Sequence, residues 1–365
     1  MRQDKFTYTQ FPVYFDISVY DDARKWIINF FSSINDVLAV YEYGTVSSPG
    51  LSDLDLIVVL KDNPKPNIYK QLIFDNIPEE KSTLINNNCV KFISKRHFHN
   101  IKWLGSSTYK LIYGEKIELN DIPLEYVDLL KIIFVMDFLP ERVLTLLKHR
   151  DSKIKSILDV IGWLKSYLIS AKLTEDIIGK NIKEVNEFER GLKDLRKNWF
   201  HKNFSEQKEI FLYLIDKGIY SGLKIIKELS HFLIFSNYYM TIDDADEAIF
   251  YFNKENGFLF KNNCNEIYNN INQYYFYDKN KSLFFYVPSI WLNHFYFYGK
   301  CDGIISSKIQ NNFILKNEIR EIGIAPKLLK ILSQRITLCN EMAAFLKKYA
   351  IPMNKLYRFG HIQHR

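Results

Sequence analysis

The residues that most constrain this fold are Asp53-Leu54-Asp55 and the apolar run that continues from them. From Leu54 to Leu60 the chain is apolar and rich in β-branched residues apart from Asp55, a pattern typical of a buried strand. Asp53 and Asp55 are two positions apart, so on a strand both side chains point to one face. Two adjacent carboxylates repel each other unless a cation lies between them. We therefore expect both aspartates to bind a divalent metal, Mg²⁺ or Mn²⁺. The alternative is an ordinary strand start, with one aspartate exposed and the other capping a turn.

A glycine turn precedes the two aspartates. Gly44 and Thr45 follow the short apolar run at residues 37–40. A tight glycine turn lets backbone N–H groups approach a phosphate, and a neighbouring hydroxyl can donate another hydrogen bond. We therefore predict that Gly44 and Thr45 bind nucleotide phosphate, with Ser52 as a further candidate.

Together these residues resemble the signature of the DNA polymerase β-type nucleotidyltransferase superfamily. Tyr43-Gly44-Thr45 stands for its apolar-Gly-Ser element, and Asp53-Leu54-Asp55-Leu56, preceded by Ser52, stands for its acidic strand. The resemblance covers about residues 25–120. Thr45 replaces the commoner serine, and the spacer of seven residues is short. The resemblance implies an α/β (α+β) core with a mixed sheet that transfers a nucleoside monophosphate from ATP or CTP with Mg²⁺ or Mn²⁺.

The superfamily also places a third carboxylate on a later strand. The expected strand at residues 89–94 carries none, and Lys95-Arg96-His97 beside it is either a triphosphate contact or a solvated loop. Glu115, directly after the strand-like run at 109–114, is our first candidate for the third catalytic carboxylate. Glu118 and Asp121 are the alternatives. If none of them completes the site, the protein uses a single metal, takes a base from its substrate, or binds nucleotide without catalysis.

The rest of the chain divides by its patterning. We expect a nucleotidyltransferase domain at 1–122, a mostly α-helical domain at 123–240 and a mixed α/β region at 241–365 that is a candidate for acceptor binding. In the first domain a helix is expected at 21–34, capped by Asp21 or Asp22, then a strand at 36–43 and a short helix at 67–76. In the last region, 273–277 and 282–287 favour a hairpin, and 326–349 favours a helix.

Charge and cysteine content indicate the kind of partner and compartment. The net charge of +7 is spread over the chain, which suits an anionic substrate such as an NTP without requiring nucleic acid. A small molecule or a protein is therefore favoured as acceptor over nucleic acid. The four cysteines lie far apart without zinc-like spacing, so they are expected to be reduced thiols. With no signal peptide and no apolar run of membrane-spanning length, we expect a cytoplasmic protein without a membrane partner.

Two other functions stay open. One is a catalytically degenerate, nucleotide-binding regulatory or scaffold protein. The other follows from Arg196 and His201, which are separated by four residues and resemble the ribonuclease motif of HEPN domains. That resemblance implies a HEPN-associated, toxin–antitoxin-type protein. The alternative is a plain helix with a packed Trp199 and a surface His201.

Overall fold

The structure of this protein is a computed structural model that describes residues 6–73, 77–78, 81, 84–85, 89–105, 107–239, 248–253, 257–261, 275–277, 283–287, 290–291, 294 and 324–356. The chain divides into two compact units. The sheet unit comprises Phe11–Val127 and Ser333–Arg365, and the helical unit comprises Met1–Gln10 and Asp128–Leu332. The three-part division expected from the sequence stays a prediction.

The sheet unit is built on a mixed four-stranded sheet. Its strands are β2 (Val37–Tyr43), β3 (Leu56–Leu60), β4 (Val90–Ser94) and β5 (Tyr109–Gly114), in the order β4-β3-β2-β5. β3 runs parallel to β4, and β2 runs antiparallel to both β3 and β5. The α+β class with a mixed sheet is therefore confirmed, while its identity as a nucleotidyltransferase core stays a prediction. β3 begins later than expected, so Asp53 and Asp55 directly precede the strand.

The helix before the sheet, α1 (Ile17–Ser32), starts earlier than expected. Asp16 is its N-cap, because its carboxylate accepts the Ser18 N–H at 2.9 Å. The predicted cap at Asp21 or Asp22 is wrong: these residues lie inside the helix and form ion pairs with basic residues three positions on. The short helices that follow are α2 (Tyr69–Leu72), α4 (Lys95–Phe98) and the 3₁₀ helix η1 (Ile101–Leu104).

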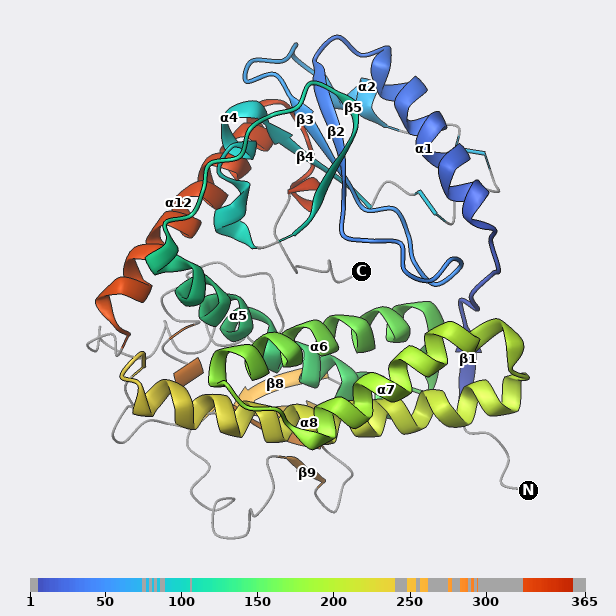
Figure 1. Ribbon diagram of the computed structural model, residues 1–365, viewed down its shortest axis with the longest axis vertical. Coiled ribbons are helices and arrows are strands. Elements are labelled where there is room, and N and C mark those ends of the chain that lie inside the picture. The colour runs from blue at the N-terminus through green and yellow to red at the C-terminus, as the bar shows by residue number, and fades with distance from the viewer. Residues whose placement is uncertain are drawn as a thin grey trace. The chain divides into compact units, whose positions relative to one another are not determined.

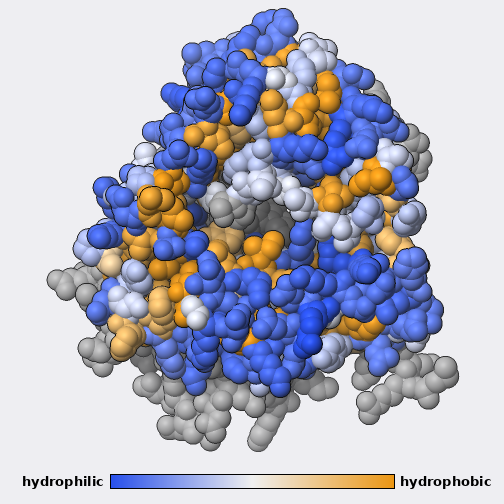
Figure 2. All heavy atoms as spheres, viewed as in Figure 1, coloured by the Kyte–Doolittle hydropathy of each residue, from blue (hydrophilic) through white to orange (hydrophobic). Residues whose placement is uncertain are grey.

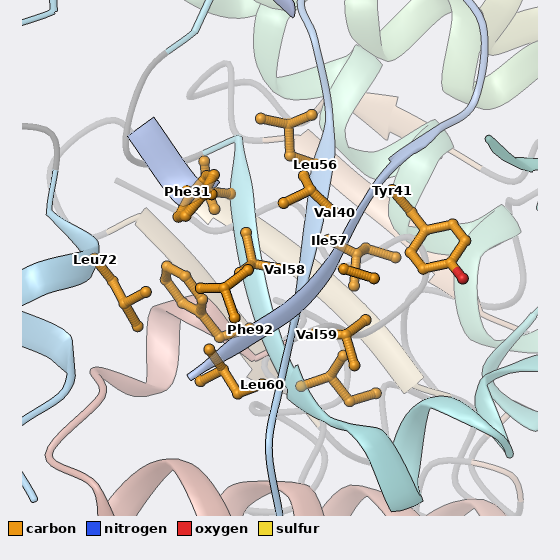
Figure 3. Close-up of a cluster of buried hydrophobic side chains, with 14 of the residues drawn as sticks. Phe31, Val40, Tyr41, Leu56, Ile57, Val58, Val59, Leu60, Leu72 and Phe92 are labelled. Atoms are coloured by element: carbon orange, nitrogen blue, oxygen red, sulfur yellow. The ribbon is translucent and has the colours of Figure 1, made fainter. Parts of the chain in front are cut away.

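Every residue of β3 is buried, and the hydrophobic core forms on both faces of the sheet. Figure 3 shows Val58 and Leu60 on the same side as Phe92, with Ile57 and Val59 on the side of Tyr41. This alternation follows from the two-residue period of a strand. A strand buried on both faces requires cover on both faces, which explains why β3 reads as a continuous apolar run.

The C-terminal segment of the chain returns to this sheet. The helix α12 (Pro326–Lys348) agrees with the helix predicted at 326–349. Its later part lies in the sheet unit, where Leu338, Met342 and Phe345 join the same core as β3. In Figure 1 this part of α12 and α1 lie on opposite sides of the sheet. After α12 come the 3₁₀ helix η3 (Met353–Lys355) and a parallel bridge between Leu356 and Phe92 of β4. Residues 351–356 therefore run along β4.

The helical unit contains α5 (Leu124–Asp151, which begins in the sheet unit), α6 (Ile157–Ile178), α7 (Lys183–Asn198), the 3₁₀ helix η2 (Trp199–His201) and α8 (Phe204–Phe235). These helices confirm the predicted helical region. α8 packs closely because it carries glycine at its contact points: a Cβ on Gly222 would lie 2.4 Å from Val143. A short parallel pair, β1 (Thr7–Thr9) and β6 (Ile154–Ser156), joins the start of the chain to this unit.

A second sheet follows in the helical unit. Its antiparallel strands are β7 (Ala248–Asn253), β8 (Gly257–Lys261), β9 (Tyr275–Tyr277) and β10 (Leu283–Val287), in the order β8-β7-β10-β9. β9 and β10 are the two strands of the predicted hairpin, and they pair antiparallel. The turn between them lies outside the described residues.

Hydrophilic residues cover most of the surface visible in Figure 2. Within the described part of the chain, no helix combines the length and apolar character that crossing a membrane requires.

Candidate metal centre

Asp53, Asp55 and Cys89 form a cluster of metal-binding side chains beside the start of β3. One ligand atom from each lies within 4.8 Å of the others. Asp53 is exposed, Asp55 is half-buried and Cys89 is buried. Solvent therefore reaches the cluster from the Asp53 side.

The sheet register explains why Cys89 joins the aspartates. β3 and β4 run parallel with Leu56 opposite Val90, and the Leu56 N–H donates to the Cys89 carbonyl at 2.9 Å. The residues directly before this pair, Asp55 and Cys89, are therefore neighbours on one face of the sheet. The Cys89 thiol donates to Asp53 Oδ2 at 3.3 Å.

Tyr43, the last residue of β2, supports Asp55 from the other neighbouring strand. Its N–H donates to the Asp55 carbonyl at 3.1 Å, and its hydroxyl donates to Asp55 Oδ1 at 3.4 Å. Burial, and then the charges of Asp55, Cys89 and Asp53, raise the pKa of Tyr43 well above its usual value. The phenol therefore stays protonated at neutral pH and can hold Asp55 as a hydrogen-bond donor.

The donor set fits a divalent metal ion. Two carboxylates from one short segment supply the hard oxygen ligands that Mg²⁺ and Mn²⁺ prefer. A cysteine sulfur is a softer ligand, which suits ions later in the first transition row. Cys89 is not among the ligands expected from the sequence, because the superfamily resemblance implies a carboxylate at the third position. The sequence does predict a strand that begins at Cys89. Only the parallel pairing of this strand with β3 shows that Cys89 lies beside Asp55.

Gly44 lies in a bend directly after β2, and its amide already has a partner. Gly44 has φ of +78°, the left-handed conformation that favours glycine. Its N–H donates to the Thr108 carbonyl at 3.2 Å, so it is engaged in the sheet rather than presented to a ligand. Thr45 is exposed. The Ser52 carbonyl accepts the Tyr20 hydroxyl at 2.6 Å, which anchors the loop before Asp53. Nucleotide binding by Gly44, Thr45 and Ser52 stays a prediction.

The structure does not bring Glu115 to the aspartates. β5 runs antiparallel to β2, so Gly114 pairs with Ala39 near the start of β2, whereas Asp55 lies next to Tyr43 at its end. Glu115 is exposed and forms an ion pair with Lys95 at 2.8 Å. The antiparallel register therefore overturns the expectation that Glu115 completes this site. Of the alternatives, Asp121 forms an ion pair with Lys102, and neither it nor Glu118 joins the cluster.

Glu115→Gln is therefore expected to leave nucleotide binding and any transfer activity unchanged. The exposed pair with Lys95 contributes little, so the free energy of unfolding should change by less than about 0.5 kcal/mol. Calorimetric titration with NTP and metal, together with urea unfolding, measures both quantities. If Glu115→Gln loses transfer activity while its stability is unchanged, Glu115 is a catalytic residue after all.

The predicted ribonuclease pair lies in the helical unit. Arg196 is in the last turn of α7, and His201 ends η2. Trp199 between them is buried, with 3% of its surface exposed, and His201 is exposed. A packed Trp199 and a surface His201 are what the plain-helix alternative expects, and the ribonuclease function stays a prediction.

Comparison with known proteins gives no match: no family model, no curated protein and no solved structure shows significant similarity to this chain. The function must therefore be argued from the site itself.

Proposed function

We propose that this protein is a metal-dependent nucleotidyltransferase. In this reaction an acceptor oxygen bonds to the α-phosphorus of an NTP, ATP or CTP, and pyrophosphate leaves. The observation that carries the proposal is the cluster of Asp53, Asp55 and Cys89 at the end of a mixed sheet, within 4.8 Å of one another and open to solvent at Asp53. Its support from sequence is the glycine turn and paired aspartates, which resemble the superfamily signature.

The two aspartates of the cluster and the neighbouring Tyr43 each have a role in this proposal. Asp53 and Asp55 would hold Mg²⁺ or Mn²⁺, which when bound neutralises phosphate charge and aligns the attacking and leaving oxygens. Tyr43 orients Asp55 through its hydroxyl. Positioning and electrostatics supply most of the catalysis in phosphoryl chemistry, so a small number of fixed side chains is sufficient.

One observation favours a second function, nucleotide binding without transfer. The place beside Asp55 on the neighbouring strand holds Cys89, and no third carboxylate joins the cluster among the described residues. A protein that retains two carboxylates can bind a metal–nucleotide complex without preparing the acceptor. A regulatory or scaffold role would then follow.

Nucleotide binding and transfer can be tested in turn. Thermal unfolding is recorded with each of the four NTPs, with Mg²⁺ and with Mn²⁺, and a rise in midpoint that requires both nucleotide and metal is expected. Pyrophosphate release is then measured with small-molecule, protein and RNA acceptors. Release that depends on one acceptor class supports transfer, binding without release supports the second function, and no binding contradicts both.

Cys89→Asp is expected to strengthen Mg²⁺ binding by about tenfold or more, because it replaces a soft ligand with a hard one. The unliganded protein should become less stable, since three carboxylates would then adjoin one another, and Mg²⁺ should restore the stability. Calorimetric metal titration and thermal unfolding measure both effects.

Cys89→Ser is the matched control. It keeps the size of the side chain and removes the sulfur, so binding of the softer ion Zn²⁺ should weaken relative to binding of Mg²⁺. Equal affinities of wild type and both variants for every ion would remove Cys89 from the metal centre.

A further inference from the structure

A buried lysine from the C-terminal segment lies beside the metal centre. Lys355, in η3, is 2% exposed, and no hydrogen-bond acceptor reaches its Nζ among the described residues. A buried ammonium without an acceptor is costly because it has lost its hydration. The arrangement is therefore expected to serve a partner that the described residues do not supply.

A second lysine stands next to it. Lys91, in β4, lies on the same face of the sheet as Cys89, two positions earlier. Its Nζ donates to the Asn354 carbonyl at 3.1 Å, across 263 positions of sequence. Asn354 adjoins Lys355, so this hydrogen bond joins the C-terminal segment to β4, which begins directly after Cys89.

The Lys355 ammonium interacts electrostatically with Lys91 and with Cys89 of the metal centre. Burial, and then the charge of Lys91, lower the pKa of Lys355 to about 8, against a smaller opposite effect of Cys89. A buried cation next to a second cation forms a place where a bound anion gains much interaction energy.

The charges of the site favour an anion once a divalent metal is bound. Asp53 and Asp55 carry two negative charges, and Lys91 and Lys355 carry two positive charges, so the set is close to neutral. A divalent metal ion on the aspartates makes it positive. Phosphate oxygens accept several hydrogen bonds at once and would satisfy the Lys355 ammonium.

We propose that Lys91 and Lys355 form a phosphate-binding site beside the metal centre, so that residues 351–356 supply part of the substrate site. The substrate class, the polyphosphate of a nucleotide, rests on the proposed function. The phosphates would bind between the metal on the aspartates and the two ammonium groups. The C-terminal end of the chain thereby completes a site whose other residues lie within its first hundred positions.

The test is titration of the full-length protein with inorganic pyrophosphate, without divalent metal. Wild type is expected to bind saturably. Lys355→Met and Lys91→Met should each weaken binding about tenfold or more. Lys347→Met, on the exposed surface of α12, is the matched control and should bind like wild type.

Stability distinguishes this role from a structural one. Lys355→Met removes a buried charge that lacks an acceptor, so the unliganded protein should unfold at the same or a higher temperature. If Lys355 instead only balances the aspartates, the variant will unfold earlier and bind pyrophosphate unchanged, which overturns the proposal. If Lys355→Met does not fold, pyrophosphate binding by Lys91→Met that equals that of wild type overturns the proposal. Absence of saturable pyrophosphate binding by wild type also overturns it.

Asp53→Asn separates this inference from the proposed function. Metal-free pyrophosphate binding uses the lysines, and Asp53→Asn removes a negative charge beside them, so this variant should bind pyrophosphate as well as wild type or more tightly. Lysine-dependent pyrophosphate binding without any nucleotidyl transfer would contradict the transferase and leave the phosphate site standing. Transfer that is insensitive to Lys355→Met would contradict the phosphate site alone.

Discussion

Asp55→Asn is expected to abolish metal-dependent nucleotide binding while leaving the sheet unit folded. The substitution keeps the size of the side chain and the hydrogen bond from Tyr43, and it removes a charged metal ligand. Loss of a group that merely orients a ligand weakens metal binding by about 10–100-fold, so loss of the ligand itself should exceed that. Asp53→Asn should act in the same direction. Calorimetric titration with NTP and metal is the measurement.

The stability of these variants carries a second expectation. Removing one of two adjacent carboxylates relieves their repulsion, so the protein without metal should be as stable as wild type or more stable. Asp121→Asn is the control, because Asp121 is exposed and forms a surface ion pair with Lys102; it should change neither property. Wild-type nucleotide affinity in both Asp53→Asn and Asp55→Asn would exclude the metal centre.

Gly114→Ala is expected to lower the free energy of unfolding by about 2–5 kcal/mol, although Gly114 is exposed. Gly114 has φ of +86°, and a Cβ there would lie 2.0 Å from the Leu38 carbonyl oxygen. A backbone oxygen cannot rotate away as a side chain can, so β5 must move away from β2. Urea unfolding followed by circular dichroism measures the change.

Gly44→Ala provides the matched control for this prediction. Gly44 has a similar φ of +78°, but no atom lies within 4 Å of its added Cβ. Only the left-handed backbone conformation opposes alanine there, which costs about 1–2 kcal/mol. Equal destabilisation by the two substitutions would show that backbone conformation alone, and not the contact with Leu38, sets the cost at Gly114.

The local structure of the sheet unit could be read largely from the sequence. The strands expected at 36–43 and 89–94 agree with β2 and β4 to within one residue, because apolar and β-branched runs are typical of buried strands. The run at 109–114, which the sequence left open as a strand or a helix end, is the strand β5. The helix at 326–349 agrees equally well with α12 for the corresponding reason. The prediction missed the start of α1, although Tyr20 continues the helical spacing of Ala23 and Ile27 toward the cap at Asp16.

The metal centre could be predicted only in part from the sequence, and the tertiary structure supplied the rest. Asp53 and Asp55 lie two positions apart, so their proximity follows from the chain alone, and the sequence determined this half of the cluster. Cys89 joins them only because β3 and β4 pair in parallel with one particular register. Glu115 is excluded for the same kind of reason, since the antiparallel pairing of β5 with β2 carries it to the far end of the sheet.

Lys355 shows the limit most clearly. No pattern in the sequence around Lys355 predicts that it lies near Lys91 or Cys89. It lies there because α12 packs on the core of the sheet unit and residues 351–356 then run along β4. The conformation of each backbone segment depends mainly on residues close in sequence, so it can be predicted from the sequence pattern. Which distant strands and segments meet is decided by the burial of whole apolar faces, and only the tertiary structure contains that outcome.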